Sequence, residues 1–224
     1  MDARAPLPLD AASPIAIKRD VHDFEIAADA AGFARAFKDV VIDPEIMFGL
    51  IRVRRPEARA GRDFAIGERF QGCFSLERAL LGALERGGFG RAKRAAAVLC
   101  ARPAIARAIT WIEDAMLSDY AEIEELDLEP APGSPYRLRY RYLDGTPIAG
   151  SSVFSVEPAG AKRCRVRQIF EYQEVNAIAL GTFQRFGLKF HDQVVHMQIH
   201  EAAARLGAEV LRSTIPVEYA RMVH

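Results

Sequence analysis

Residues 176–212 read NAIALGTFQRFGLKFHDQVVHMQIHEAAARLGAEVLR and contain no proline. Most of these residues favour helix, so the stretch predicts one long helix, which at about 1.5 Å per residue would span roughly 50 Å. Its apolar residues fall on two nearly opposite arcs, and a helix that is apolar on two sides is buried on two sides. The first arc holds Phe183, Phe186, Phe190, Val194, Met197 and Ala204, and the second holds Leu188, Val195, Ile199, Leu206 and Val210.

The segments before this helix alternate between apolar and charged residues. A two-residue period predicts antiparallel strands with one apolar and one charged face. Asp144-Gly145 is a typical hairpin turn between two of them. The four predicted strands are Tyr120–Leu128, Tyr136–Leu143, Gly150–Glu157 and Arg163–Tyr172.

The N-terminal half opens with a compact unit. Residues 21–27 (VHDFEIA) alternate and predict a short strand, and Asp29 is placed to cap a helix from Ala30 to Lys38. Asp43-Pro44 then predicts the start of a second short helix. Two further strands are predicted at Ile51–Arg55 and Asp63–Leu76.

Residues 77–112 differ in composition from the rest of the chain. They are rich in Ala, Arg and Leu and predict helices broken at Gly87-Gly88 and before Pro103. Seven basic residues stand against two acidic ones, a local net charge of +5 (7 − 2). Such a segment is usually a solvated face; the other interpretation is a basic surface that touches anionic lipid headgroups or covers a cavity.

Composition sets the broad class. The 224 residues are half hydrophobic and 27% charged with zero net charge, which fits one soluble domain and gives no field that favours nucleic acid. Three separated cysteines indicate reduced thiols in a cytoplasmic protein. The sequence contains no run of 18 apolar residues, so no membrane-spanning helix is predicted. Residues 1–19 lack the apolar core of a signal peptide and are expected to be a flexible tail.

The order of these elements resembles the helix-grip fold of the START-like (SRPBCC) superfamily, which includes Bet v 1-like proteins and polyketide cyclases. The resemblance lies in VHDFEIA with its helix pair, YRLRYRYLDGTPIAGSSVFSVEP, RVRQIFEY and the last helix. It covers residues 20–212, with 77–112 as an insertion and 213–224 as a C-terminal extension. It implies an α+β fold, a curved antiparallel sheet wrapped around the long helix, and an apolar cavity for lipids, sterols or polyketide-like compounds.

A register follows if the loop 130–134 centres a hairpin near Pro132. Asp127 then lies opposite Arg137 and Glu125 opposite Arg139 on the outer face, where such pairs are worth about 0.2–1 kcal/mol. The same register turns Glu122 and Glu124 inward, beside Tyr142 and Tyr140 respectively. A slip of one residue would reverse that orientation.

Three carboxylates are therefore candidate acid–base residues: Glu201, Glu122 and Glu124. Glu201 falls inside the first apolar arc, where poor solvation would raise its pKa. The competing interpretation is a salt bridge from Glu201 to a basic group such as Arg35 or Arg52.

The expected binding surface combines the helix with the aromatic inner face of the sheet. Aromatic rings with polar tips suit a ring-bearing or amphipathic ligand, although they suit a plain core equally well. His196 and His200 share a helix face, but no third ligand accompanies them, so no metal and no other cofactor is expected. The predicted ligand-binding residues are Phe183, Phe186, Phe190, Gln193, Met197, Tyr140, Tyr142, Gln168 and Phe170.

Three functions remain open. The first is a binding or transport protein for an apolar or amphipathic small molecule. The second is a cyclase or dehydratase acting on a polyketide-like substrate with cavity carboxylates and tyrosines. The third is an interaction module with a filled core, such as a homodimer through the second apolar arc. No GxxxxGK[ST], GxGxxG or GxSxG string supports nucleotide or α/β-hydrolase chemistry.

Overall fold

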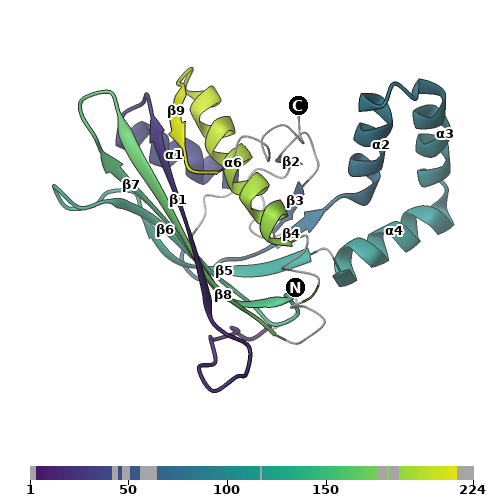
Figure 1. Ribbon diagram of the computed structural model, residues 1–224, viewed down its shortest axis with the longest axis horizontal. Helices are drawn as coiled ribbons and strands as arrows, with labels where there is room; N and C mark the ends of the chain where they lie inside the picture. Colours follow the sequence, from purple (N-terminus) through teal and green to yellow (C-terminus); the bar gives the residue numbers. More distant parts are fainter. Residues whose placement is uncertain are drawn as a thin grey trace.

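The computed structural model describes residues 4–41, 45–46, 51–55, 65–116, 118–175, 181 and 187–215. They form a curved antiparallel sheet with helices α1 and α6 on its concave side, and three further helices project from one end (Figure 1). The sheet order is β2-β3-β4-β5-β6-β7-β8-β1-β9. This is the α+β helix-grip fold that the sequence predicts.

The strands are β1 Lys18–Ile26, β2 Glu45–Ile46, β3 Ile51–Arg54, β4 Arg69–Phe74, β5 Ser118–Asp127, β6 Tyr136–Tyr142, β7 Ile148–Pro158, β8 Cys164–Glu174 and β9 Val210–Ser213. The helices are α1 Ala30–Val41, α2 Leu76–Arg86, α3 Gly90–Cys100, α4 Pro103–Met116 and α6 Leu188–Arg205.

The core lies between the concave face of the sheet and the two helices. Asp29 caps α1 as expected, because its Oδ1 accepts a hydrogen bond of 2.7 Å from the Gly32 amide. The ring of Phe37 in α1 then packs on Phe154 in β7, with centroids 4.7 Å apart. From α6, Val195 and Ile199 enter the same cluster. Apolar burial on this face is the main stabilising term of the fold.

The predicted last helix is too long at its C-terminal end. Helix α6 ends at Arg205 because Gly207, at φ +63°, adopts the left-handed conformation that closes a helix. Its amide bonds to the carbonyl of Ala204 at 3.0 Å, and that of Ala208 bonds to Ala203 at 2.9 Å. Residues 210–213 form β9 instead, which pairs with β1. Positions 176–180 and 182–186 of the predicted helix lie outside the described residues.

Two smaller expectations also differ from the structure. Where Asp43-Pro44 predicts a short helix, Glu45–Ile46 form strand β2; positions 42–44 and 47–50 lie outside the described residues. Part of the expected N-terminal tail is attached to the sheet. The amide of Leu7 bonds to the carbonyl of Tyr142 at 3.1 Å, and that of Asp10 bonds to Oε1 of Gln173 at 2.8 Å.

The insertion is helical and breaks where predicted, at Gly87-Gly88 and before Pro103. Helices α2 and α3 stand side by side beyond the end of the sheet, and α4 leads back to β5 (Figure 1). Within the described part of the chain, no single helix has both the length and the hydropathy to cross a membrane. The segments Gly90–Cys100 and Pro103–Asp114, bent by 89° at their junction, meet that test only as a pair.

Candidate functional site

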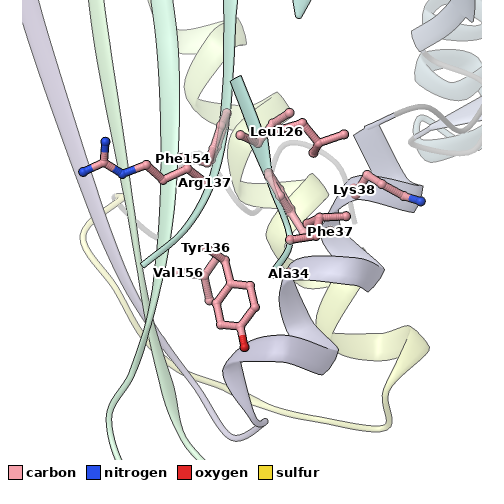
Figure 2. A pocket seen from close by; sticks show the side chains of 10 residues that line it. Ala34, Phe37, Lys38, Leu126, Tyr136, Arg137, Phe154 and Val156 are labelled. Carbon is pink, nitrogen blue, oxygen red and sulfur yellow. The ribbon is translucent and has the colours of Figure 1, made fainter. Parts of the chain in front are cut away.

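One pocket lies between α1 and strands β5 to β7. Figure 2 shows the side chains that line it, among them Phe37 of α1, Leu126 of β5 and Phe154 of β7. Its volume is about 10 Å³, which is room for a single water. This pocket is therefore a packing defect of the core and does not accommodate an organic ligand.

A chain of polar side chains crosses the concave face under the first turns of α6. Its centre is Gln168 in β8, which is fully buried. The Nε2 of Gln168 lies 2.9 Å from the hydroxyl of Ser152 and 3.3 Å from Nε2 of His191. Ser152 in turn hydrogen-bonds with the Tyr140 hydroxyl, which also contacts Tyr142. The polar chain thus links three strands to α6.

The polar chain continues to a buried group of charges. His191 Nδ1 lies 3.5 Å from Oδ1 of Asp192, and the same oxygen lies 3.1 Å from Nε2 of His22 in β1. His22 also lies 3.4 Å from a carboxylate oxygen of Asp20. The register places His22 directly opposite Gln168, so this group of charges lies beside the centre of the polar chain.

The titration of these groups follows from their neighbours. Burial alone would lower the pKa of His22, but hydrogen bonds and charges from Asp192 and Asp20 outweigh it and raise that pKa to about 9. Burial opposes ionisation of Asp192, yet the hydrogen bonds from His191 and His22 lower its pKa to about 2. At pH 7, therefore, one imidazolium stands between two carboxylates.

His191 has the opposite character. Burial lowers its pKa below the ordinary value of 6.5, and the hydrogen bond to Asp192 only partly offsets this effect. His191 is thus neutral at pH 7. With Asp192 accepting the proton of Nδ1, the lone pair of Nε2 accepts the hydrogen bond from Gln168. This pairing leaves Oε1 of Gln168, a buried acceptor, without a hydrogen-bond partner among the described residues.

Aromatic rings surround this polar chain. Phe170 stacks on both His191 and Tyr172, with centroid distances of 4.0 Å and 4.5 Å. Tyr140 meets Tyr142 edge to face at 5.9 Å. Burial raises the pKa of Tyr140 to about 12, so its hydroxyl keeps its proton and can donate a hydrogen bond.

A further carboxylate lies on the same face. Asp119 follows the inward alternation of Ala121 and Ile123 in β5, and its charge acts on Tyr140 and Tyr142. Its side chain is exposed, and desolvation by the protein atoms around it raises its pKa to about 6. A carboxyl with that pKa can exchange a proton near neutral pH.

His22, His191 and Asp192 also place three donor atoms within 4.8 Å of one another, a spacing that can hold a divalent cation. The raised pKa of His22 opposes this use, because a metal would have to displace a proton that two carboxylates stabilise. We therefore interpret the group as proton-bridged.

The expected placement of Glu201 is wrong. Its side chain is half exposed and forms an ion pair with Arg205 one turn later, with 3.2 Å between Oε1 and Nε. The residues of α6 that face the core are instead Val195, Ile199 and Ala202. Glu201 therefore does not sit in a desolvated site, and the salt-bridge interpretation is correct with a different partner.

The inward orientation expected for Glu122 and Glu124 is also wrong. The pairs Asp127–Arg137 and Glu125–Arg139 form as predicted, but a bulge between Ile123 and Glu125 shifts the register. Glu122 consequently lies opposite Arg141 and bonds to it at 2.9 Å and to Arg69 at 2.8 Å. Glu124 pairs with Arg139 at 2.9 Å. Both carboxylates belong to the outer charged face.

The predicted ligand-binding residues divide into three groups. Gln168, Phe170, Tyr140 and Tyr142 come together along the polar chain described above. On α6, Phe190 packs against Phe74 of β4 at 4.8 Å, while Met197 packs against the core cluster, and Gln193 is half-buried. Phe183 and Phe186 lie outside the described residues.

Four members of the polar chain were not predicted: Ser152, His191, His22 and Asp192. The sequence marks the last two. His22 shares its strand face with Phe24 and Ile26, so a titratable ring falls on an apolar face. Asp192 lies four residues after Leu188 and three before Val195, inside the second apolar arc of the helix. A buried polar residue on an apolar stripe requires a partner, and each of these two is the partner of the other.

Comparison with known structures places this fold. Norcoclaurine synthase of Thalictrum flavum, as a point mutant with a transition-state analogue, aligns with TM-score 0.52 and 11% identity over 84% of this chain and 94% of its own. Its complex with dopamine and hydroxybenzaldehyde gives 0.51 and 11% over 90% and 96%. An aromatase/cyclase from a Streptomyces species gives 0.52 and 12% over 85% and 96%.

These similarities confirm the helix-grip fold. No protein-family model matches the chain, and neither does any curated protein sequence.

Proposed function

We propose that the protein binds a ring-bearing, amphipathic small molecule on the concave face of the sheet, beneath the first turns of α6. The observation behind this proposal is the unpartnered Oε1 of Gln168, a fully buried acceptor set among aromatic rings. Leaving such an atom without a hydrogen bond costs about 1–3 kcal/mol. A hydroxyl or amine on the ligand would remove that cost.

The surroundings of Gln168 support the same class of ligand. Phe170, Tyr172 and His191 offer stacked rings, whereas Ser152 and the Tyr140 hydroxyl offer hydrogen bonds. Apolar bodies with one or two polar groups complement such a surface. The same fold in norcoclaurine synthase is found in complex with dopamine and hydroxybenzaldehyde, which are molecules of this kind.

Native mass spectrometry of the full chain, purified without organic solvent, tests this proposal. We expect a bound small molecule that is released on denaturation. The bound fraction should be lower in the Gln168→Met variant, which keeps the side-chain volume but removes both polar atoms. Ser155→Ala on the outer face of β7 serves as the control and should keep the molecule. A molecule retained equally by both variants would contradict the site, and the absence of any bound molecule in the wild type would favour the interaction module with a filled core.

A second candidate is a cyclase or dehydratase acting on a polyketide-like substrate. The specific observation in its favour is the convergence of a neutral imidazole, a protonated tyrosine and a carboxyl with raised pKa on one apolar face. In this proposal the substrate displaces the Gln168 amide from Nε2 of His191. Nε2 then removes a proton from a carbon next to a ketone, and that carbon attacks a second carbonyl. Tyr140 protonates the resulting alkoxide. The tyrosinate then takes the second proton of the attacking carbon while the imidazolium of His191 protonates the departing hydroxyl, so that water leaves and both side chains regain their starting protonation.

Heptane-2,4,6-trione is a suitable probe, because one aldol closure with loss of water and enolisation converts it into orcinol. We expect the wild type to accelerate orcinol formation and His191→Asn to abolish the acceleration. His200→Asn, on the exposed side of the same helix, is the control and should have no effect. Equal rates with and without protein would contradict the enzymatic candidate and leave the binding proposal standing.

We also propose a cytoplasmic location. Cys73, Cys100 and Cys164 are all free and buried. Burial raises the pKa of Cys164 to about 12, so this thiol stays protonated and unreactive. A chain with only unpaired thiols suits a reducing compartment.

A further inference from the structure

The helical insertion α2–α4 exposes an unusual amount of apolar surface. Among the described residues, eleven large hydrophobic side chains are exposed, and five of them belong to residues 76–116. Trp111, Val98 and Phe89 are the most exposed of these, at 69%, 67% and 61%. Leu80 and Leu99 complete the set. Exposed aromatic and aliphatic side chains gathered on one segment indicate an interaction surface.

Basic side chains accompany these apolar ones. In α4, Arg107 precedes Trp111 by one helical turn, and in α3, Arg94 precedes Val98 by the same spacing. Both arginines are exposed. Residues four apart lie side by side on a helix, so each pair offers a cation next to an apolar group on the outward face.

The acids of α4, and Glu85 of α2, do not neutralise this surface. Glu113 is fully buried and pairs with Arg52, and Asp114 pairs with Arg54 at 2.7 Å, so both carboxylates face strand β3. Glu85 is matched by Lys93 at 2.7 Å. The outward faces of α3 and α4 therefore keep an excess of positive charge, which complements an anionic partner.

We propose that this insertion docks the protein on an anionic membrane surface. Helices with apolar and aromatic groups beside Lys and Arg are suited to the boundary between headgroups and acyl chains, where the cations meet phosphate and the apolar groups enter the lipid. The inference is independent of the ligand proposal. It gives a reason for an insertion that projects away from the sheet (Figure 1).

Trp111 is the only tryptophan of the chain and lies on the proposed surface, so its fluorescence reports contact directly. With vesicles of phosphatidylcholine and phosphatidylserine, we expect a blue shift of its emission and co-sedimentation of the full chain. Both effects should weaken in high salt and be absent with phosphatidylcholine alone. A blue shift without vesicles that depends on protein concentration would show self-association instead, and would overturn the proposal.

Matched variants distinguish an effect of this surface from a general effect of positive charge on the protein. Arg94→Gln with Arg107→Gln should weaken partitioning by about 30-fold, because each basic residue near an anionic bilayer contributes about fivefold. Arg163→Gln with Arg165→Gln removes the same charge from the exposed end of β8 and should leave partitioning nearly unchanged. Val98→Ser should reduce partitioning without changing its salt dependence. Equal losses in the two arginine pairs, or no partitioning by the wild type, would refute the assignment.

Discussion

His22 in β1 and Asp192 in α6 are 170 positions apart in the chain, and their side chains meet at 3.1 Å in the buried layer between sheet and helix. This ion pair holds the first turns of α6 over Gln168, the residue on which the binding proposal depends. A buried pair of this kind is costly to break, because each partner would leave the other charge uncompensated.

Stability should depend on pH through His22. A group with a raised pKa stabilises the fold fully below its ordinary pKa of 6.5, and this contribution disappears as pH rises through about 9. We therefore expect the free energy of unfolding in urea to fall between these values. The His22→Gln variant should be less stable at pH 6 and should show a flatter dependence. A parallel decline in both proteins would argue against the pair.

The contribution of Asp192 to stability depends on pH in the opposite sense. Because the pKa of Asp192 is lowered to about 2, its contribution to the free energy of unfolding is fully present above its ordinary pKa of 3.8. This contribution is lost as the pH falls from 3.8 through about 2.

Glu201 should be dispensable. It is half exposed and interacts with Arg205 in an i,i+4 pair, for which about 0.5 kcal/mol is the usual upper value. Glu201→Gln should leave stability within that margin and leave ligand binding unchanged. A large loss of binding in this variant would restore the carboxylate to the site and contradict its observed orientation.

The end of α6 should depend on a single backbone conformation. Gly207 has φ +63°, and an added Cβ would meet no atom within 4 Å, so Gly207→Ala introduces only backbone strain. We expect a loss of about 1 kcal/mol in thermal or urea unfolding. Gly90→Ala at the start of α3 has equal space and an ordinary φ, and should cause no loss. Similar losses in both variants would be inconsistent with the helix ending at Arg205.

Glu113 should anchor the insertion. Its buried carboxylate accepts a 2.8 Å hydrogen bond from the Leu76 amide and pairs with Arg52, thereby joining the first residue of α2 to the sheet. Glu113→Gln should cost about 1–3 kcal/mol and speed hydrogen exchange in α2. The half-exposed pair of Asp114 with Arg54 gives a control, and Asp114→Asn should cost less than about 1 kcal/mol. The reverse ranking would show that the anchor lies elsewhere.

Much of the fold follows from local pattern. The alternation of Tyr136 to Tyr142 and of Cys164 to Tyr172 predicts the meander, and the break at Gly87-Gly88 predicts the helical hairpin, because strand and turn signals reside in neighbouring residues. The site depends on features without such a signature. One bulged residue, Glu124, reverses the orientation of Glu122, and the contact of Asp192 with His22 requires knowing where α6 crosses β1.

The central claim is that the face containing Gln168 binds a ring-bearing amphipathic molecule. Fluorescence titration with 8-anilinonaphthalene-1-sulfonate, which combines aromatic rings with a polar group, tests it most directly. We predict saturable one-to-one binding that Gln168→Met and Ser152→Ala weaken and Ser155→Ala does not. Absence of saturable binding, or equal affinity in all four proteins, would contradict the account.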